Sequence, residues 1–474
     1  MSGIVSWWIW LFSWFGSRAP PHDPAYVMLS QHPGDGLART DYSRGIFIVG
    51  ATGGGKTQSV MATLVKAALR NKIPCLFTTA KNSDGDLQER WCRETNSPFV
   101  RFRPGGPVKL SLLDYLTSFF ALQEVSSTLD GVLEMVIRTG SYGSAQGGDA
   151  FFPMMASMYC KQLIALLKSA KRRVTPLAMK QLLMGLPKKP EDALSDAFKK
   201  SDAADVLRAA LVDASFEAEQ AVMWALHERP HLAEKTRSGV EANIHILLDR
   251  LLASPIRETF CSDESNVTPE HLTQGRYSVI LDFPALSLGA PAIFAQTLAL
   301  SVFAKVALRG CKGMLMVLDE SHLFLTQEAI RWTATGRSQG LWMIAATQGV
   351  ATMEAGLGGG EQGRQFASAI MSNLQTHLYG VNNCPVTNER AVSLVGKERK
   401  QFRSSGFNTQ QQGLFDDKPG GGSSFNVGTS EQMDWILDPV IFATLLPGEV
   451  VVLQSGRRWS NGKTYLRTRF KMGG

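Results

Sequence analysis

The sequence predicts an α/β fold of the P-loop (RecA-like) class, with a mainly parallel central sheet and an inserted all-α domain. Three observations predict it. A phosphate-binding motif follows a short apolar run near the N-terminus, apolar runs alternate with helical patterns in the C-terminal half, and a long stretch between them has helical periodicity only. With 474 residues, 44% hydrophobic and 19% charged, the chain is long enough for two or three ordinary globular domains.

Residues 1–27 form an aromatic segment and a proline-rich connector. Residues 4–16 are uncharged and contain four tryptophans. As a helix they would reach ~20 Å, too short for a hydrocarbon core of ~30 Å, and they lack the basic start and cleavage site of a secretory signal. Two interpretations stay open: an in-plane membrane anchor, or a segment that packs on a partner protein or a neighbouring subunit.

The phosphate-binding motif (Walker A) occupies residues 50–57 and matches G-x-x-x-x-G-K-[ST]. It lies between a β-branched run at 45–49 and a helical pattern from Gln58 to Arg70. Glycines let backbone N–H groups surround phosphate oxygens, and the helix N-terminus adds partial positive charge. We expect Lys56 to reach the β- and γ-phosphates and the Thr57 hydroxyl to bind Mg²⁺. The residues predicted to bind ATP are Gly50, Ala51, Thr52, Gly53, Gly54, Gly55, Lys56, Thr57 and Gln58.

A second apolar run, residues 313–318, ends at an acidic pair of Walker B type, Asp319 and Glu320. We expect Asp319 to hold Mg²⁺ through water and Glu320 to act as the base that polarises the attacking water. Such a pair in isolation is more often a helix N-cap, but the upstream motif favours catalysis. The two motifs together predict ATP and Mg²⁺ as ligands.

Between these motifs, residues 126–254 are expected to form the all-α insert, flanked by the nucleotide-binding domain at 28–125 and 255–474. Residues 161–200 carry ten basic and three acidic side chains, a net +7 that equals the excess of the whole chain, 49 against 42. Basic clusters also occur at 397–403 and 457–469. These clusters favour contact with a polyanion such as nucleic acid, although solvated basic helix faces give the same counts.

The remaining pattern alternates strands and helices. Six single cysteines without metal-ligand spacing indicate a reducing compartment and no structural zinc. Gly358–Gly360 and residues 404–430, which are rich in Gly, Ser, Gln and Asn, are expected to be mobile loops. Strands are predicted at 73–79, 99–102, 277–284, 340–348 and 376–381, and a long apolar helix at 291–308.

Together these segments resemble the type IV coupling proteins (TraG/TraD-like), the hexameric DNA-translocating ATPases of conjugation and type IV secretion, which belong with the HerA/FtsK branch of P-loop enzymes. The resemblance covers about residues 45–470. Besides the two motifs it is carried by Phe151-Phe152, Ala156, 163–167, Thr236–Leu252, 255–257, 279–284, Gly336-Arg337, Gly340, Gln348, Ser372-Asn373, Tyr379-Gly380 and 446–449.

This resemblance implies roles for two further side chains. Arg337 resembles the arginine finger that reaches the neighbouring subunit's γ-phosphate, and Gln348 resembles the polar sensor at a strand end. The alternatives are an ordinary exposed arginine and a strand-end hydrogen bond. Two segments depart from the family pattern. Only the short aromatic segment stands where the family has two membrane helices, and residues 79–84 replace an Asp-Pro-Lys-Gly-Glu type loop.

The resemblance implies an ATP-driven motor that moves DNA or a nucleoprotein in conjugative or mobile-element transfer. It also implies a homo-oligomeric, hexameric ring, with DNA and relaxase or secretion-channel proteins as partners. We expect the protein in the cytoplasm or peripherally at the inner face of the cell membrane. Three alternatives stay open: a HerA-like DNA-processing or defence translocase, a secretion ATPase, and an ATP-gated adaptor that docks protein cargo to a secretion channel.

Overall fold

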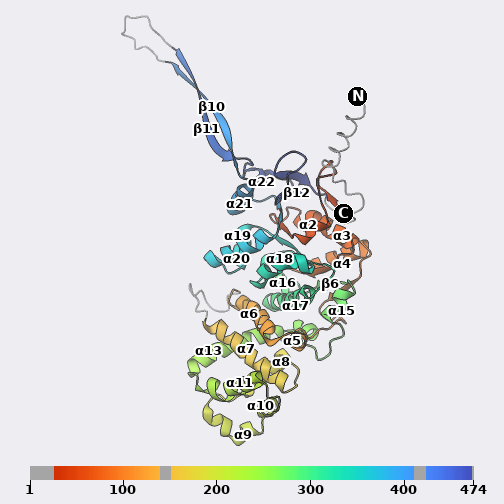
Figure 1. Ribbon diagram of the computed structural model, residues 1–474, viewed down its shortest axis with the longest axis vertical. Helices are drawn as coiled ribbons and strands as arrows, with labels where there is room; N and C mark the ends of the chain where they lie inside the picture. Colours follow the sequence, from red (N-terminus) through yellow and green to blue (C-terminus); the bar gives the residue numbers. More distant parts are fainter. Residues whose placement is uncertain (1–25, 139–150, 410–422, 472–474) are drawn as a thin grey trace, which may run out of the picture.

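The computed structural model describes residues 26–138, 151–409 and 423–471. The aromatic segment at 4–16, proposed to contact a membrane or a partner, lies outside these residues. Figure 1 shows an elongated molecule with the sheet in its middle, a helical region at one end and a two-stranded ribbon at the other.

The centre is a nine-stranded sheet in the order β13-β12-β9-β3-β8-β7-β4-β6-β5. From β9 to β5 all neighbours are parallel, whereas β12 is antiparallel to β9 and to β13. This confirms the predicted fold class. The strands are β3 (Ile46–Val49), β4 (Cys75–Thr78), β5 (Phe99–Phe102), β6 (Ser278–Leu281), β7 (Met314–Leu318), β8 (Leu341–Thr347), β9 (Thr376–Gly380), β12 (Glu449–Gln454) and β13 (Tyr465–Arg469). A small separate sheet pairs β1 (Val27–Met28) with β2 (Gly36–Leu37).

Helices cover both faces of the sheet, so its inner strands are fully buried and read as continuous apolar runs. Alternate residues of a strand enter two different cores: Phe47 and Val49 one, Ile46 and Ile48 the other. The helices on the second face include α2 (Arg39–Ser43), α3 (Ala62–Arg70), which follows the π-helical turn η1 (Lys56–Met61), and α4 (Asp84–Glu94). Those on the first face include α17 (Ala290–Leu308), α18 (Glu328–Gln339) and α20 (Gly360–Asn373).

Helix α17 lies at the heart of the molecule. Among the described residues it alone is long and apolar enough to cross a membrane, but 78% of its most apolar window is buried inside the protein. Its apolar character is therefore that of a core helix, packed between the sheet and the helical region.

The helical region is inserted between β5 and β6, and the described residues between these two strands form no other strand. It begins before residue 126 and continues past residue 254. Its main helices are α5 (Leu112–Phe119), α6 (Leu122–Arg138), α7 (Phe151–Ser169), α8 (Pro176–Gly185), α10 (Asp202–Val212), α11 (Phe216–Met223), α13 (Glu234–Leu251), α14 (Ile256–Phe260) and α15 (Pro269–Gln274). Tyr159 and Trp224 pack edge to face at its centre, with ring centroids 4.8 Å apart.

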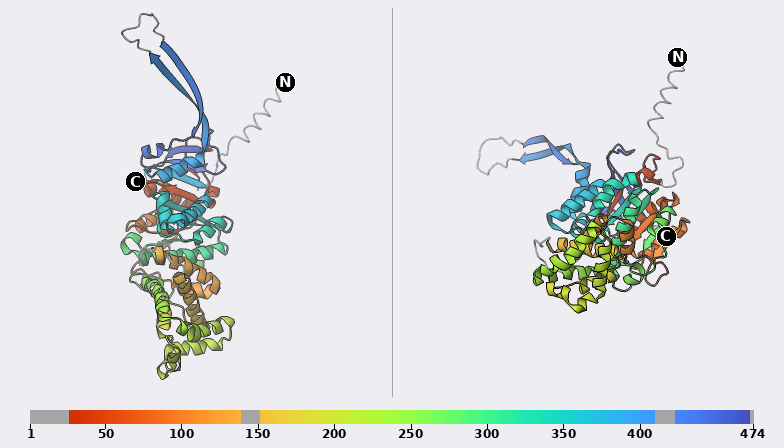
Figure 2. Two further views of the ribbon diagram at one scale, coloured as in Figure 1. Left: turned by 90° about the vertical axis from the view of Figure 1, so that its left-hand side faces the viewer. Right: turned by 60° about the horizontal axis from the view of Figure 1, so that its bottom comes forward.

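The prediction of a mobile loop at 404–430 is wrong for the part that the structure describes. Strands β10 (Lys397–Thr409) and β11 (Ser423–Trp435) pair antiparallel in one register, from Lys397 opposite Trp435 to Thr409 opposite Ser423. Backbone hydrogen bonds hold such a ribbon whatever its side chains, so a composition rich in Gly, Ser and Asn concealed it. Figure 2 shows the ribbon projecting from the sheet domain, away from the helical region.

Gly358, Gly359 and Gly360 also form a defined connection rather than a long loop. They join α19 (Val350–Gly356) to α20, with φ angles of 110°, 67° and 58°. These positive values are strained for residues with a Cβ, which explains three consecutive glycines.

Candidate active site

The candidate site lies where three neighbouring strands end. In the order β3-β8-β7, the carboxyl end of β3 leads into the phosphate-binding loop, β8 into Gln348 and β7 into Asp319. The Thr57 hydroxyl donates a hydrogen bond to Asp319 Oδ2 at 2.6 Å, although the two residues are 262 positions apart. The fold thus brings the two predicted halves of the site together.

The phosphate-binding loop is held in place by the C-terminal part of the chain. The Gly448 N–H donates to the Gly54 carbonyl at 3.0 Å. Gly55 has a φ of 80°, and a Cβ added there would lie 2.7 Å from the Gly448 nitrogen. The Ser59 hydroxyl donates to the Gly55 carbonyl. Sequence reasoning noted 446–449 only as part of the resemblance and missed this support, because nothing in the spacing indicates which loop it contacts.

Lys56 is buried inside this loop, with 8% of its surface exposed. Its Nζ donates to the Gly50 carbonyl at 3.1 Å and lies 3.8 Å from Glu320 Oε1. Burial lowers the pKa of Lys56, and the Glu320 and Asp319 carboxylates partly offset this. A buried ammonium with only one close carboxylate is well placed to bind phosphate oxygens.

Glu320 is 4% exposed and sits in the left-handed region, with φ 50°. Its Oε1 accepts a hydrogen bond from Gln348 Nε2 at 3.2 Å, whereas Oε2 is buried without a hydrogen-bond partner. One oxygen is thus held and the other has a free hydrogen-bonding capacity, which a general base uses to bind the attacking water. Strained backbone at such a position is typical of functional sites.

His322 is a further member that sequence reasoning missed. Its Nδ1 lies 3.7 Å from Glu320 Oε2, and burial lowers the pKa of its imidazole, against the opposing effect of the Glu320 charge. Its position two residues after Glu320 was the only signal. On the other side, Asn382 Nδ2 donates to the Gln348 carbonyl at 2.7 Å and fixes the end of β8.

Thr57 and Asp319 fit a Mg²⁺ ion. Both offer oxygen ligands, which Mg²⁺ prefers, and the ion commonly binds one or two protein side chains together with phosphates and water. The adjacent loop, residues 79–84, is closed by Asp84, which accepts hydrogen bonds from the N–H groups of Ala80 and Lys81 at 2.9 and 2.7 Å. Burial raises the pKa of Asp84, and the Asp319 charge adds to the effect.

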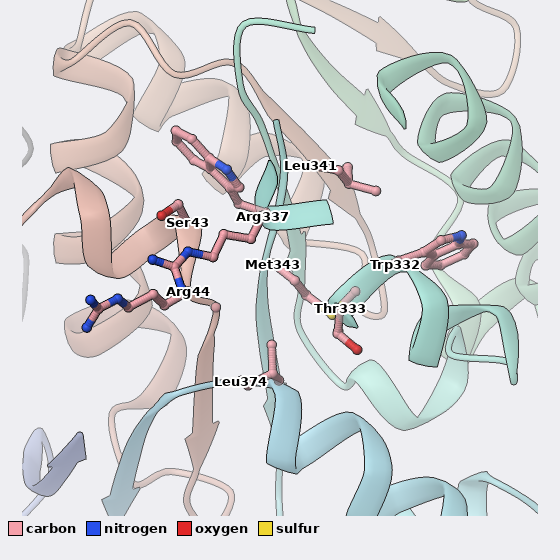
Figure 3. A pocket seen from close by; sticks show the side chains of 10 residues that line it. Ser43, Arg44, Trp332, Thr333, Arg337, Leu341, Met343 and Leu374 are labelled. Carbon is pink, nitrogen blue, oxygen red and sulfur yellow. The ribbon is translucent and has the colours of Figure 1, made fainter. Parts of the chain in front are cut away.

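Arg337 is the one predicted catalytic residue that the fold does not bring to this edge. It lies in the last turn of α18, just before β8 begins, so it sits at the opposite edge of the sheet from Lys56. There it lines a small pocket with Arg44, which precedes β3, and Figure 3 shows the two side chains extending in the same direction. The predicted role of Arg337 as an arginine finger therefore requires a nucleotide bound by another chain.

Comparison with known proteins agrees with the predicted resemblance. Residues 313–437 match a family model described as the TraM recognition site of TraD and TraG. No curated protein matches the chain in sequence.

Three similar solved structures are of the bacterial conjugative coupling protein TrwB. The trigonal form of TrwBdeltaN70 with sulphate has 11% identity and a TM-score of 0.60, covering 93% of this chain and 88% of that chain. The complexes of TrwB with ADP and Mg²⁺ and with the ATP analogue ADPNP have 13% and 14% identity and TM-scores of 0.55 and 0.56, at the same coverage. They show the shared fold. With the family match they confirm the resemblance to TraG/TraD-like coupling proteins.

Proposed function

We propose that this TraG/TraD-like chain is a P-loop ATPase that hydrolyses ATP to move DNA, or DNA with bound protein, in conjugative or mobile-element transfer. The observation that carries the proposal is the hydrogen bond from the Thr57 hydroxyl to Asp319 Oδ2 at 2.6 Å, with Glu320 buried next to Asp319. TrwB, which has the same fold, is named as a conjugative coupling protein and has been solved with ADP and Mg²⁺.

The residues of one chain have separate tasks in hydrolysis. Lys56 binds the β- and γ-phosphates, and Thr57 and Asp319 would hold Mg²⁺, which when bound neutralises phosphate charge. Gln348 orients Glu320 through Oε1, leaving Oε2 to accept the proton of the attacking water. His322, kept neutral by burial, leaves the negative charge of Glu320 uncompensated on that side.

The last group comes from a neighbouring chain. Because Arg337 lies at the opposite edge of the sheet from Lys56, a ring of identical chains is needed to place its guanidinium near a γ-phosphate. A delocalised guanidinium neutralises charge that develops on the transferred phosphoryl group. We propose a ring of six copies, the number that the resemblance implies.

DNA contacts in such a motor are made mainly to phosphates, so the affinity for DNA should fall steeply with salt concentration and depend little on the DNA sequence.

In the helical insert, Arg172 and Arg173 are already paired with Asp202 and Asp114 at 3.2 and 3.0 Å, so part of the basic charge of the insert is neutralised within the chain. We propose that the insert recognises cargo and that relaxase or secretion-channel proteins are partners. We also propose that the protein resides in the cytoplasm or peripherally at the inner face of the cell membrane.

The test is hydrolysis by the full chain with and without DNA. We expect DNA to stimulate hydrolysis, and Lys56→Ala and Glu320→Gln to abolish it, while the variants Lys109→Ala and Glu361→Gln, at exposed positions, behave as the unmodified chain. A rate of hydrolysis that does not change when DNA is added would contradict the motor and favour the ATP-gated adaptor. Absence of hydrolysis under all conditions would contradict the ATPase itself.

A further inference from the structure

Among the residues that the structure describes, the β10–β11 ribbon contacts the rest of the chain at its base, where β11 meets α21 (Pro385–Val395) and Trp435 packs against the core, and the remainder is uncovered. Its two strands pair over thirteen positions each, about 44 Å of extended chain, and form a sheet of two strands only. Three large apolar side chains are exposed on it: Phe402 by 43%, Val427 by 57% and Met433 by 59%. Because isolated two-stranded ribbons are at best marginally stable in water, this one needs further strands or a packing partner.

The two outer edges of the ribbon carry opposite charge. Strand β10 has four basic residues and one acid, a net of +3, whereas β11 has two acids and no base, a net of −2. Within the ribbon, Lys400 pairs with Asp434 at 3.0 Å and Gln401 donates to Glu431 at 3.2 Å.

Two arginines of β10 remain without an acidic partner. Arg399 and Arg403 are both exposed, and in the described parts of the chain no carboxylate lies within ion-pair distance of either. In the antiparallel register they lie on the same ribbon face as Glu431 and Thr429 of β11. A strand that joined the β10 edge would therefore meet unpaired positive charge, and one that joined the β11 edge would meet negative charge.

We propose that the ribbon of one copy pairs edge to edge with the ribbon of the next, β10 beside the neighbour's β11, so that the ribbons form a continuous collar at one end of the ring. The inference rests on the ring in the proposed function. Within a ribbon the strands alternate in direction, so β10 beside a neighbour's β11 keeps the whole collar antiparallel. The same contact repeated head to tail closes in a ring and leaves no free strand edge.

The charge pattern favours another copy of this chain over DNA as the occupant. The ribbon as a whole carries a net charge of only +1, and its acids Glu398, Glu431 and Asp434 would face phosphates. A second copy of the ribbon offers a negatively charged edge to β10 and a positively charged edge to β11. The collar would lie at the end of the molecule opposite the helical insert (Figures 1 and 2).

The experiment reverses the charge of one edge at a time in the full chain. One variant combines Arg399→Glu with Arg403→Glu, and the other combines Thr429→Lys with Glu431→Lys. A control combines Lys188→Glu with Lys189→Glu in the helical insert. Sedimentation velocity and native mass spectrometry, with and without the ATP analogue ADPNP, report assembly without requiring hydrolysis.

We expect each edge variant alone to assemble at least about tenfold more weakly than the unmodified chain, and the control to assemble normally. An equimolar mixture of the two edge variants should recover, because each interface then joins opposite charges. Mixing leaves the charges inside each ribbon unchanged, so recovery identifies a contact between copies.

A mixture that stays dissociated would overturn the inference. So would edge variants that assemble normally but lose DNA binding, which would assign the ribbon to DNA. Edge variants that form rings and hydrolyse ATP in response to DNA just as the unmodified chain does would refute the collar and leave the proposed function standing. Ribbon-dependent assembly without DNA-stimulated hydrolysis would support the collar and contradict the function.

Discussion

Glu320 has one carboxylate oxygen held by Gln348 and one, Oε2, buried without a hydrogen-bond partner. The change Glu320→Gln keeps the size of the side chain and an oxygen that Gln348 can bond, but removes the base. We expect hydrolysis to fall by at least ~10²-fold while ATP binding persists. Single-turnover hydrolysis and calorimetric titration with ADPNP measure the two effects. Hydrolysis within a few-fold of the unmodified rate would exclude Glu320 as the base.

His377 makes a second prediction, about stability. Burial lowers its pKa to about 4, and Nε2 contacts the Leu374 carbonyl at 2.6 Å. Between pH 6.5 and 4 only the unfolded chain takes up a proton at this site, so stability falls as pH falls. From pH 7 to 5 this costs about 2 kcal/mol, since one pKa unit is worth ~1.4 kcal/mol.

Urea unfolding at the two pH values checks this effect. The variant His377→Gln should lose about 2 kcal/mol less than the unmodified chain on acidification, and the exposed-site variant His227→Gln should follow the unmodified chain. Equal losses in all three proteins would show that His377 is not held neutral by the fold.

At the residue scale, the sequence predicted the site residues that belong to short motifs. The motif at 50–57 and the pair Asp319-Glu320 are short patterns with a fixed strand before them, and the structure brings Thr57 and Asp319 into contact. Gly448 and Asn382 were missed because each acts through a hydrogen bond to a backbone carbonyl far away in the sequence, from the N–H of Gly448 and the side chain of Asn382. Such contacts leave no periodicity or spacing to detect.

At the scale of elements, the phosphate-binding loop makes a prediction with an internal control. Gly53 and Gly55 both have φ 80°, but a Cβ on Gly53 meets nothing within 4 Å, whereas one on Gly55 meets the Gly448 nitrogen at 2.7 Å. Gly53→Ala should cost about 1–2 kcal/mol, the strain of the left-handed conformation alone. Gly55→Ala should cost more, because the turn at Gly448 must also move. Melting temperatures of the nucleotide-free variants measure the difference, and equal values would contradict the contact.

Elements were predictable where burial shaped their sequence. Strands β3, β7 and β8 lie between two helical layers, so every position except Thr347 is apolar and the runs are visible. The β10–β11 ribbon is exposed and held by backbone pairing, so its residues carry no such constraint. The antiparallel strands β12 and β13 were also missed. In β13, at the sheet edge, buried and exposed residues are mixed.

At the scale of the whole molecule, the sheet separates the phosphate-binding loop from the proposed arginine finger. The phosphate-binding loop lies at the carboxyl ends of the parallel strands, and Arg337 lies at the other edge, beside Arg44 and the start of β8. Under the proposed function, a single chain would therefore hold one ATP site and the arginine finger for a different ATP site. The sequence indicated this role for Arg337 only through family resemblance, because no other motif of the chain points to it.

This separation predicts complementation between two inactive proteins. Arg337→Ala chains keep an intact loop, and Lys56→Ala chains keep an intact finger. In a random equimolar mixture about a quarter of the interfaces then join a working loop to a working finger, so hydrolysis should recover to roughly that fraction if interfaces act independently. Hydrolysis measured against mixing ratio should peak near equal amounts, and mixing Lys56→Ala with Glu320→Gln chains, both defective in the loop half, should give no recovery. A mixture as inactive as its components would place Arg337 outside the reaction, because no geometry within one chain brings it to Lys56.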